Sequence, residues 1–365
     1  MITTILIATA VLYFIQMILL RIGLKKSNNV SIVTGYEPSV SVIVAARNEE
    51  QHIENCLQSL SHLDYPTGKL EIIVVNDCST DRTAEAVENF IKTHSGVKSI
   101  TITPGTGNLR GKTNAVARGI GVSRGEILMF TDADCMVPAS WIRETLKYFD
   151  KDIGIVGGFT LLNASNNFKG MQSLDWIFLF GLASAMAGWN KPLTVIGNNL
   201  SVRRCAYEAT GGYEHISFSV TEDYALVQAI LRRTNFKINF PADPHTAVQS
   251  KACQNLKQLY RQKQRWGVGG LNMVFRGMVI MSIGWLLRSV LLATIFFFDP
   301  SPVFVIAPFM MLIDLAFLWN TVKRLRAIPL LKFLFSFEVY NLRYVPLIPL
   351  VALLSKNIVW KERRL

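Results

Sequence analysis

Long apolar stretches lie at both ends of the chain, and a region of mixed polarity separates them. The first covers residues 2–20, and three more follow at 278–298, 302–319 and 330–354. A helix needs about 20 apolar residues to cross a bilayer. The pattern therefore predicts an N-terminal membrane anchor and a C-terminal group of membrane helices around a soluble α/β region.

Basic residues indicate how these helices are oriented. Arg21, Lys25 and Lys26 follow the first apolar stretch, and no basic residue precedes it. Positive charge favours the cytoplasmic side of a membrane, so we expect an uncleaved anchor with its N-terminus outside. A cleaved signal peptide is the alternative, but it would carry its basic residues before the apolar run.

The last apolar stretch leaves the C-terminal topology open. The cluster 323–326 is basic and predicts a cytoplasmic position, and so does the basic tail at 361–364. Pro346 and Pro349 interrupt the stretch between them, which either crosses once or forms a re-entrant pair. Charged residues inside a membrane are costly and usually pair. We expect pairing between helices, rather than a transport path, for the four charged residues in or near the spans, Arg288, Asp314, Glu338 and Arg343.

The overall charge and the cysteines narrow the class of protein. The net charge of +12 suits a protein beside anionic lipid, and no base-stacking motif points to nucleic acid. The five cysteines are scattered and form no Cys-x-x-Cys pair. They predict neither a disulfide framework nor a zinc site, and they agree with a reducing cytoplasm.

Strands and helices alternate in the central region. Apolar runs of strand length suit parallel strands that are buried on both faces, and helical segments separate them. The alternation predicts a doubly wound sheet, whose ligands bind beyond the carboxyl ends of the strands. The expected strands are 40–46, 70–75, 99–103 and 126–130, with helices ending near 60 and 92 and a further helix at 112–121.

Polar residues gather where these strands end. Glu49 lies just beyond the first strand, Asp77 follows the second, and Asp132 and Asp134 follow the fourth. Alternate strand residues share a face, so the last two can converge on Mg²⁺ or Mn²⁺, although an Asp-rich turn is the alternative. The chain has no Gly-x-Gly-x-x-Gly after its first strand and no Walker loop, which argues against a classical dinucleotide or ATP site.

Four spaced elements together resemble the inverting, membrane-bound family 2 glycosyltransferases. They are Ala45 to Glu49 with Val75 to Asp77, Asp132-Ala133-Asp134, Thr221-Glu222-Asp223, and Gln262-Lys263-Gln264-Arg265-Trp266. The resemblance covers about residues 39–266. It implies an α/β GT-A domain, the Rossmann-like fold of nucleotide-diphospho-sugar transferases, between transmembrane helices. The expected parts are an anchor at 1–22, the catalytic domain at 37–250, an amphipathic interfacial segment at 251–275 and membrane helices at 276–357.

The resemblance also implies a role for each matching residue. Asp223 would be the general base, with Glu222 beside it, and Asp132 and Asp134 would bind the metal. Gly197, Asn198 and Trp266 would meet the acceptor. The donor would contact Ala46, Arg47, Glu49, Asp77, Lys112, Asp132, Gln262, Arg265 and Trp266.

Other interpretations of these motifs stay open. Arg47 stands where many synthases have an aromatic residue, which puts uracil stacking there in doubt. Thr221 and the two acids after it could be an ordinary helix start, with threonine as the cap and acids on the dipole. The segment 252–271 has the mixture of apolar and basic residues typical of a helix lying on a membrane.

The predicted function is metal-dependent transfer of a sugar from a UDP-sugar to a polysaccharide or a membrane lipid, in the cytoplasm at an inner or plasma membrane. The expected partners are the donor, the acceptor, membrane lipids and a possible membrane subunit, with no nucleic acid. A polyprenyl-phosphate sugar synthase is the nearest alternative, but it would normally lack Gln-x-x-Arg-Trp. A non-catalytic subunit with the same fold is the second alternative, and a transporter is the third.

Overall fold

The structure is a computed structural model that describes residues 2–354, 359–361, 363 and 364. The chain forms two compact units. We call them the sheet unit, made of 27–161, 194–251 and 359–365, and the helical unit, made of 1–26, 162–193 and 252–358. Each is continuous in space although its segments are separated along the chain.

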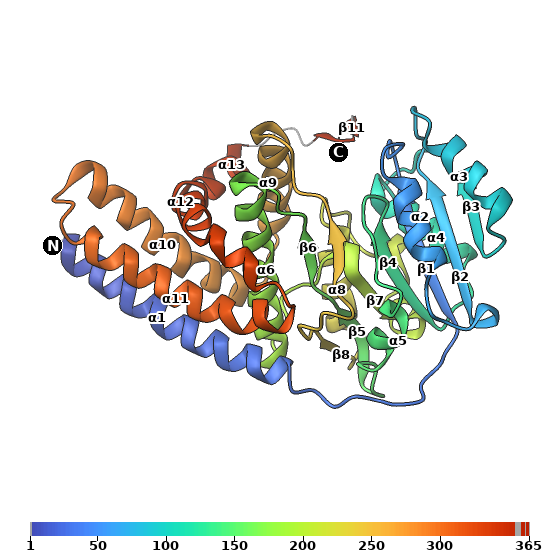
Figure 1. The fold of residues 1–365 in the computed structure, drawn as a ribbon, viewed down its shortest axis with the longest axis horizontal. Helices are drawn as coiled ribbons and strands as arrows, with labels where there is room; N and C mark the ends of the chain where they lie inside the picture. Colours follow the sequence, from blue (N-terminus) through green and yellow to red (C-terminus); the bar gives the residue numbers. More distant parts are fainter. Residues whose placement is uncertain (1, 355–358, 362, 365) are drawn as a thin grey trace. The chain divides into compact units, whose positions relative to one another are not determined.

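The sheet unit is built on a seven-stranded sheet of order β3-β2-β1-β4-β7-β5-β8 (Figure 1). The first four strands run parallel, as predicted, but β7 runs antiparallel to both of its neighbours. The sheet is therefore mixed, and strand–helix alternation predicts only its parallel half. The strands are β1 (Val40–Ala46), β2 (Leu70–Asn76), β3 (Val97–Thr101), β4 (Ile127–Asp132), β5 (Ile153–Gly157), β7 (Leu200–Arg203) and β8 (Lys237–Asn239).

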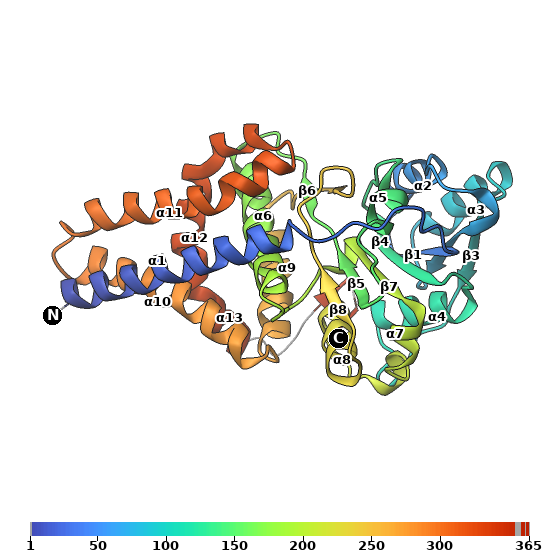
Figure 2. The same ribbon diagram turned by 90° about the horizontal axis from the view of Figure 1, so that it is seen from below.

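Helices cover both faces of the parallel half, because β1 is apolar on both sides. Val42 and Val44 belong to one core cluster with residues of α2 (Ile53–Ser61) and α3 (Thr83–Thr93). Ile43 points to the opposite face, where α4 (Lys112–Val122) packs (Figure 2). This face needs a glycine, because a Cβ on Gly119 would lie 2.6 Å from the Ile43 side chain. The remaining helices of the unit are α5 (Trp141–Leu146), α7 (Arg204–Glu208) and α8 (Glu222–Arg233).

The strand register sets where the predicted site lies. Ala45 of β1 pairs with Val75 of β2 on one side and with Asp132 of β4 on the other. The loops after these three strands therefore emerge next to one another. This arrangement confirms that the polar residues after the strands share one edge of the sheet.

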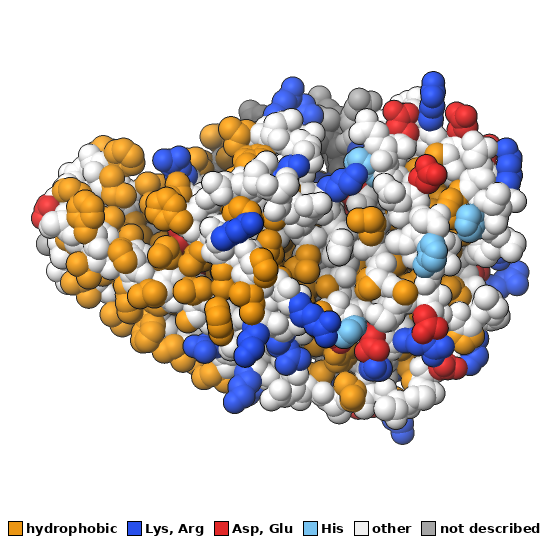
Figure 3. Space-filling view, viewed as in Figure 1, with side chains coloured by type: hydrophobic (Ala, Val, Ile, Leu, Met, Phe, Trp, Pro, Cys, Tyr) orange, Lys and Arg blue, Asp and Glu red, His pale blue; other side chains and the backbone are white. Residues whose placement is uncertain are grey.

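The helical unit holds all four helices that are long and apolar enough to cross a membrane in the part of the chain that the structure describes. They are α1 (Ile2–Ser27), α10 (Phe275–Phe297), α11 (Val303–Arg324) and the segment 328–354. Figure 3 shows hydrophobic side chains gathered over the first three. The last segment is divided into α12 (Leu334–Tyr344) and α13 (Ile348–Leu354), with a short 3₁₀ turn at Val345–Leu347 that contains Pro346.

Two further helices complete this unit, α6 (Asn167–Gly188) and α9 (Leu256–Gly270). The sequence did not predict α6, although it lies inside the stretch 37–250 expected to form one domain. Its contacts group it with the helical unit instead. The domain boundaries at 22, 37, 250, 275 and 357 stay predictions.

Two of the four charged residues that we expected to pair between helices, Arg288 and Asp314, form an ion pair. Arg288 of α10 donates to Asp314 of α11 at 2.8 Å, and the Tyr13 hydroxyl of α1 also donates to Asp314. All three side chains are buried, and Glu338 of α12 is buried as well. Unlike these four residues, Arg343 has an exposed side chain.

Candidate active site

Lys112 forms ion pairs with two carboxylates at the edge of the sheet where the parallel strands end. Its Nζ lies 2.6 Å from Asp132 Oδ1 and 3.0 Å from Glu222 Oε1. Lys112 is the first residue of α4, and Gly111 before it has a φ of 54°, a left-handed conformation that favours glycine. The Gly-Lys pair in the sequence therefore turns the chain so that this lysine reaches β4 and α8.

Asp223 is held in place by backbone amides in the first turn of α8. Its Oδ2 accepts from the Gly197 amide at 2.7 Å, and its Oδ1 accepts from the Tyr224 amide at 2.8 Å. Burial raises the pKa of Asp223, and the charge of Glu222 raises it further, to about 6, against the opposing effect of Lys112. A carboxylate with such a pKa is ionised near neutral pH and still accepts a proton readily.

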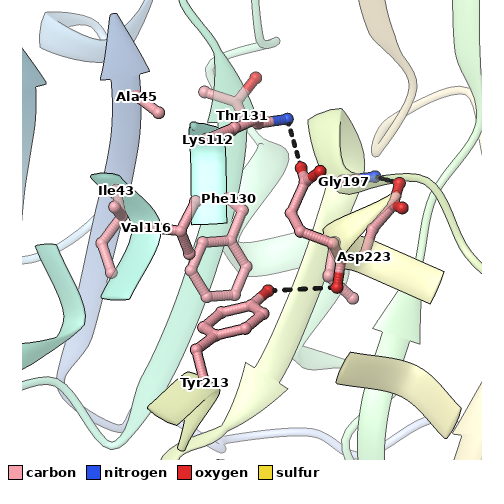
Figure 4. Close-up of a pocket in the computed structure, with 11 residues that line it drawn as sticks. Ile43, Ala45, Lys112, Val116, Phe130, Thr131, Gly197, Tyr213 and Asp223 are labelled. Atoms are coloured by element: carbon pink, nitrogen blue, oxygen red, sulfur yellow. Dashed lines mark hydrogen bonds and ion pairs between the residues drawn. The ribbon is translucent and has the colours of Figure 1, made fainter. Parts of the chain in front are cut away.

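A small pocket with an apolar floor opens beside these groups (Figure 4). Tyr213 lies in it, and its hydroxyl points toward the Glu222 carbonyl at 3.5 Å. Sequence analysis did not identify Tyr213, because only its position next to Gly211 and Gly212 sets it apart from other aromatic residues. The pocket is lined by Ile43, Ala45, Lys112, Val116, Phe130, Thr131, Gly197, Leu200, Tyr213, Glu222 and Asp223.

The acidic residues near the ends of β1 and β4 influence one another. Burial raises the pKa of Asp134, and the neighbouring charge of Asp132 raises it further. Burial also raises the pKa of Glu49, against the opposing charge of Lys361, whose Nζ lies 2.6 Å from Glu49 Oε1. The sequence indicated Lys361 only as part of a basic tail.

Asp132 and Asp134 fit a partly hydrated divalent cation. No group of three or more His, Cys, Asp or Glu side chains in the described residues could hold a metal ion on its own. Two carboxylates that repel each other are nevertheless a suitable ligand pair for Mg²⁺ or Mn²⁺, which complete their shells with water and phosphate oxygens. Burial is the larger cause of the raised pKa of Asp134, and the charge of Asp132 adds to it, as expected for two carboxylates that lie close together.

Arg47 links the loop that follows β1 to the loop that follows β2. Its guanidinium is buried and donates to the carbonyl oxygens of Asp77 and Cys78, at 2.7 Å each. Ala46 is also buried, and its carbonyl accepts from the Asp77 amide. The structure thus brings the predicted donor residues Ala46, Arg47, Glu49 and Asp77 to one place, while their contacts with a donor stay predictions.

Two predicted acceptor residues, Gly197 and Asn198, belong to the sheet unit, and Gly197 contacts Asp223, the predicted base. A Cβ on Gly197 would lie 3.3 Å from Asp223 Oδ2, so the backbone approaches the carboxylate closely there. Asn198 is buried, and its Oδ1 accepts from the Thr160 hydroxyl at 2.9 Å. Its side chain is therefore engaged inside the unit, and its predicted contact with an acceptor is untested.

The segment Gln262 to Trp266 belongs to α9 in the helical unit. Lys263, which the sequence analysis did not single out, forms a buried ion pair with Asp175 of α6 and lies 4.5 Å from the centre of the Trp266 ring. Gln262 has a buried Oε1 that accepts no hydrogen bond from the described residues. Within the same residues, Arg265 forms no ion pair.

Comparisons with known proteins identify the family and the fold of this chain. The model of "Glycosyl transferase family group 2" matches residues 127–351, more than half of the chain, and that of "Glycosyl transferase family 2" matches 41–210. The chain is 28% identical over 246 residues to a probable glycosyltransferase, YdaM, of Bacillus subtilis, which covers 66% of this chain and 57% of that protein. It is 30% identical over 247 residues to a beta-monoglucosyldiacylglycerol synthase of Nostoc, which covers 65% and 50%.

A poly-beta-1,6-N-acetyl-D-glucosamine synthase of Staphylococcus epidermidis is 26% identical, with coverages of 65% and 56%. The chain thus spans about half the length of the curated relatives it matches. A mannosyltransferase of Pyrobaculum calidifontis, solved in complex with GDP-Man and Mn²⁺, superimposes with a TM-score of 0.64 at 20% identity, covering 94% of this chain and 99% of that one. That likeness confirms the GT-A fold.

Proposed function

Since this chain belongs to the family 2 glycosyltransferases, we propose that it transfers a sugar from a nucleotide-diphospho-sugar to a hydroxyl of a polysaccharide or a membrane lipid, with inversion. The observation that carries the proposal is the Asp223 carboxylate, which the amides of Gly197 and Tyr224 orient next to the Lys112 bridge and whose pKa is raised to about 6. The names of the relatives, one a glycolipid synthase and another a polysaccharide synthase, support both kinds of acceptor.

Asp223 acts as the general base of a single displacement. The acceptor hydroxyl oxygen forms a bond to the anomeric carbon while the bond from that carbon to the diphosphate oxygen breaks. The hydroxyl proton passes to the Asp223 carboxylate. The amides of Gly197 and Tyr224 fix the orientation of this carboxylate, so it does not need to reorganise during the reaction.

The leaving diphosphate gathers negative charge, which positive groups stabilise. Lys112 supplies an ammonium group at the edge of the site. Asp132 and Asp134 would hold Mg²⁺ or Mn²⁺, which supplies Lewis-acid stabilisation of the phosphate oxygens when bound. Glu49 and Asp77 would bind the nucleoside, which we propose to be uridine. GDP is the second candidate, because the mannosyltransferase with the same fold binds GDP-Man.

The α9 residues take the remaining roles. Arg265 is proposed to bind diphosphate, because a guanidinium with no ion-pair partner in the described residues is available to an anion. Gln262 offers a buried amide oxygen that has no donor among those residues. Trp266 offers a flat ring to a sugar. A role for a separate membrane subunit is compatible with these assignments.

We place the active site on the cytoplasmic side of an inner or plasma membrane. Arg21, Lys25 and Lys26 follow the first candidate span, and Lys323 and Arg324 end α11. Basic residues of this kind stay on the cytoplasmic side. The enzyme would therefore take its donor from the cytoplasm and its acceptor from the membrane.

Membranes that contain the full chain would be incubated separately with labelled UDP-sugars and GDP-sugars, and lipid-extractable product would be separated from polymer. We expect transfer from at least one UDP-sugar, and its loss in Asp223→Asn. Transfer that is equal with and without the Asp223 carboxylate would overturn the assignment of the base. The absence of transfer from every donor would overturn the function.

A further inference from the structure

Lys112 occupies a position that a divalent cation would also need. Its ammonium lies 2.6 Å from Oδ1 of Asp132, and the carboxylates of Asp132 and Asp134 are the pair that fits a metal. The second carboxylate on the same ammonium, Glu222 Oε1 at 3.0 Å, comes from α8 and has no part in the proposed metal site. Lys112 is therefore held between Asp132 and Glu222. A metal bound to Asp132 would not disturb the ion pair with Glu222.

We propose that Lys112 is an internal cation that keeps metal off Asp132 until a diphosphate arrives. The inference rests on the proposed function and deepens it, because it sets the order in which the ligands bind. Metal and nucleotide would bind together. As they bind, the Lys112 ammonium would leave Asp132 and form an ion pair with a phosphate oxygen.

Electrostatics support this exchange. An ammonium and a divalent cation on one carboxylate oxygen would repel each other strongly at a partly buried position. The Lys112 side chain is 21% exposed and that of Asp132 is 34% exposed, so an arriving anion can reach both. A diphosphate supplies the negative charge that lets Lys112 leave Asp132 without losing its ion pairing.

The second acid explains why the lysine stays when no ligand is bound. Asp132 alone would provide one partly exposed ion pair, which is weak. Glu222 is 12% exposed in its side chain and adds a second, better buried partner. The bridge thus joins the proposed metal site to the residue next to the base, and donor binding would break it at its Asp132 end.

Lys361 offers a matched comparison within the same unit. It also lies beside an acid, Glu49, at 2.6 Å, and its charge acts on Asp134. Its hydrogen bonds join it to Glu49 and to Arg47 and Asn48, and among the described residues its one ion pair is with Glu49 rather than Asp132. Removing the charge of Lys361 therefore shows the effect of losing a nearby positive charge, whereas removing that of Lys112 also removes the cation that blocks Asp132.

The experiment measures Mn²⁺ binding to the purified full chain by electron paramagnetic resonance, without nucleotide and with UDP or GDP in separate arms. The variants are Lys112→Met, Lys112→Arg and Lys361→Met, each checked for cooperative thermal unfolding. Without nucleotide, we expect Lys112→Met to bind Mn²⁺ at least about tenfold more tightly than the unmodified chain, on the scale of one charge contact at a partly exposed site. Lys112→Arg should bind as weakly as the unmodified chain, and Lys361→Met should change affinity much less than Lys112→Met.

Two results would overturn the inference alone. In one, the unmodified chain binds Mn²⁺ with nucleotide but Lys112→Met gains no affinity without it. In the other, Lys361→Met gains as much as Lys112→Met, which would show a general charge effect. If no variant binds Mn²⁺ in any arm, the metal requirement of the proposed function fails together with this inference.

Discussion

Two lysines, one in each unit, are paired with acids in different ways. Lys112 of the sheet unit is 21% exposed and is shared between carboxylates of β4 and α8. Lys263 of the helical unit is 5% exposed, and its one ion-pair partner in the described residues is Asp175. The rings of Trp266 and Tyr344 lie within 5 Å of the Lys263 ammonium.

The comparison separates a charge that can change partners from one that cannot. A ligand can reach Lys112 and replace one of its acids, so its ion pairs suit a binding site. Lys263 is enclosed by protein, and breaking a buried pair by removing one partner leaves an uncompensated charge. We therefore interpret the first lysine as functional and the second as structural support for α9.

The largest expected effect tests the buried side of this comparison. Lys263→Met should lower the free energy of unfolding by about 3–5 kcal/mol, because Asp175 stays buried without a counter-charge. The double variant Asp175→Leu with Lys263→Met should recover much of this loss. Thermal unfolding in detergent measures both, with Lys112→Met as the matched single variant, which should lose less stability. Equal losses in the two single variants would remove the distinction.

The next effect concerns Asp223, the proposed base, which lies near the partly exposed Lys112. Asp223→Asn should lower transfer by about 10²-fold or more, since the amide cannot take the acceptor proton. Nucleotide inhibition should stay nearly unchanged, because Asp223 is not assigned to the donor. Steady-state rates and inhibition by the product nucleotide would be measured together. A collapse of nucleotide affinity would make Asp223 a binding residue.

The residues around the buried lysine should show divided roles. Trp266→Ala should weaken acceptor use by roughly 1–3 kcal/mol, about the burial energy of a large side chain, and spare nucleotide inhibition. Arg265→Ala should weaken nucleotide inhibition, because a guanidinium is matched to diphosphate. Acceptor titrations and inhibition curves would be compared for the two. Equal weakening of inhibition in both would mean that they bind nucleotide as one group.

The smallest expected effect is the pH dependence. Burial and Glu222 raise the pKa of Asp223 to about 6, and a general base must be ionised to accept a proton. Transfer should therefore be level above about pH 7 and fall about tenfold per pH unit below about pH 6 as the carboxylate is protonated. A profile of kcat/KM between about pH 5 and 8 tests this. The fall should be absent from the residual activity of Asp223→Asn, and persistence there would assign the titration to another group.

Sequence patterns predicted the parallel strands and the candidate spans well, and the reasons are local. Each of these elements has a continuous apolar run bounded by polar residues, which is visible without any partner. The helix α6 was missed because most of its side chains are buried, so it shows no strong difference between its faces. The antiparallel β7 has only four residues, and its direction depends on its neighbours β4 and β5.

The sequence by itself determined the candidate chemistry of this protein. The acids at or just after the ends of β1, β2 and β4, the Gly-Lys start of α4 and the family motifs were all recognisable as groups suited to a metal and a diphosphate. Only the tertiary structure decided which charges meet. Lys263 and Asp175 are 88 residues apart, and Lys112 joins acids from two distant segments. Such pairs arise from the packing of separate elements, and a local pattern of polar and apolar residues carries no information about that packing.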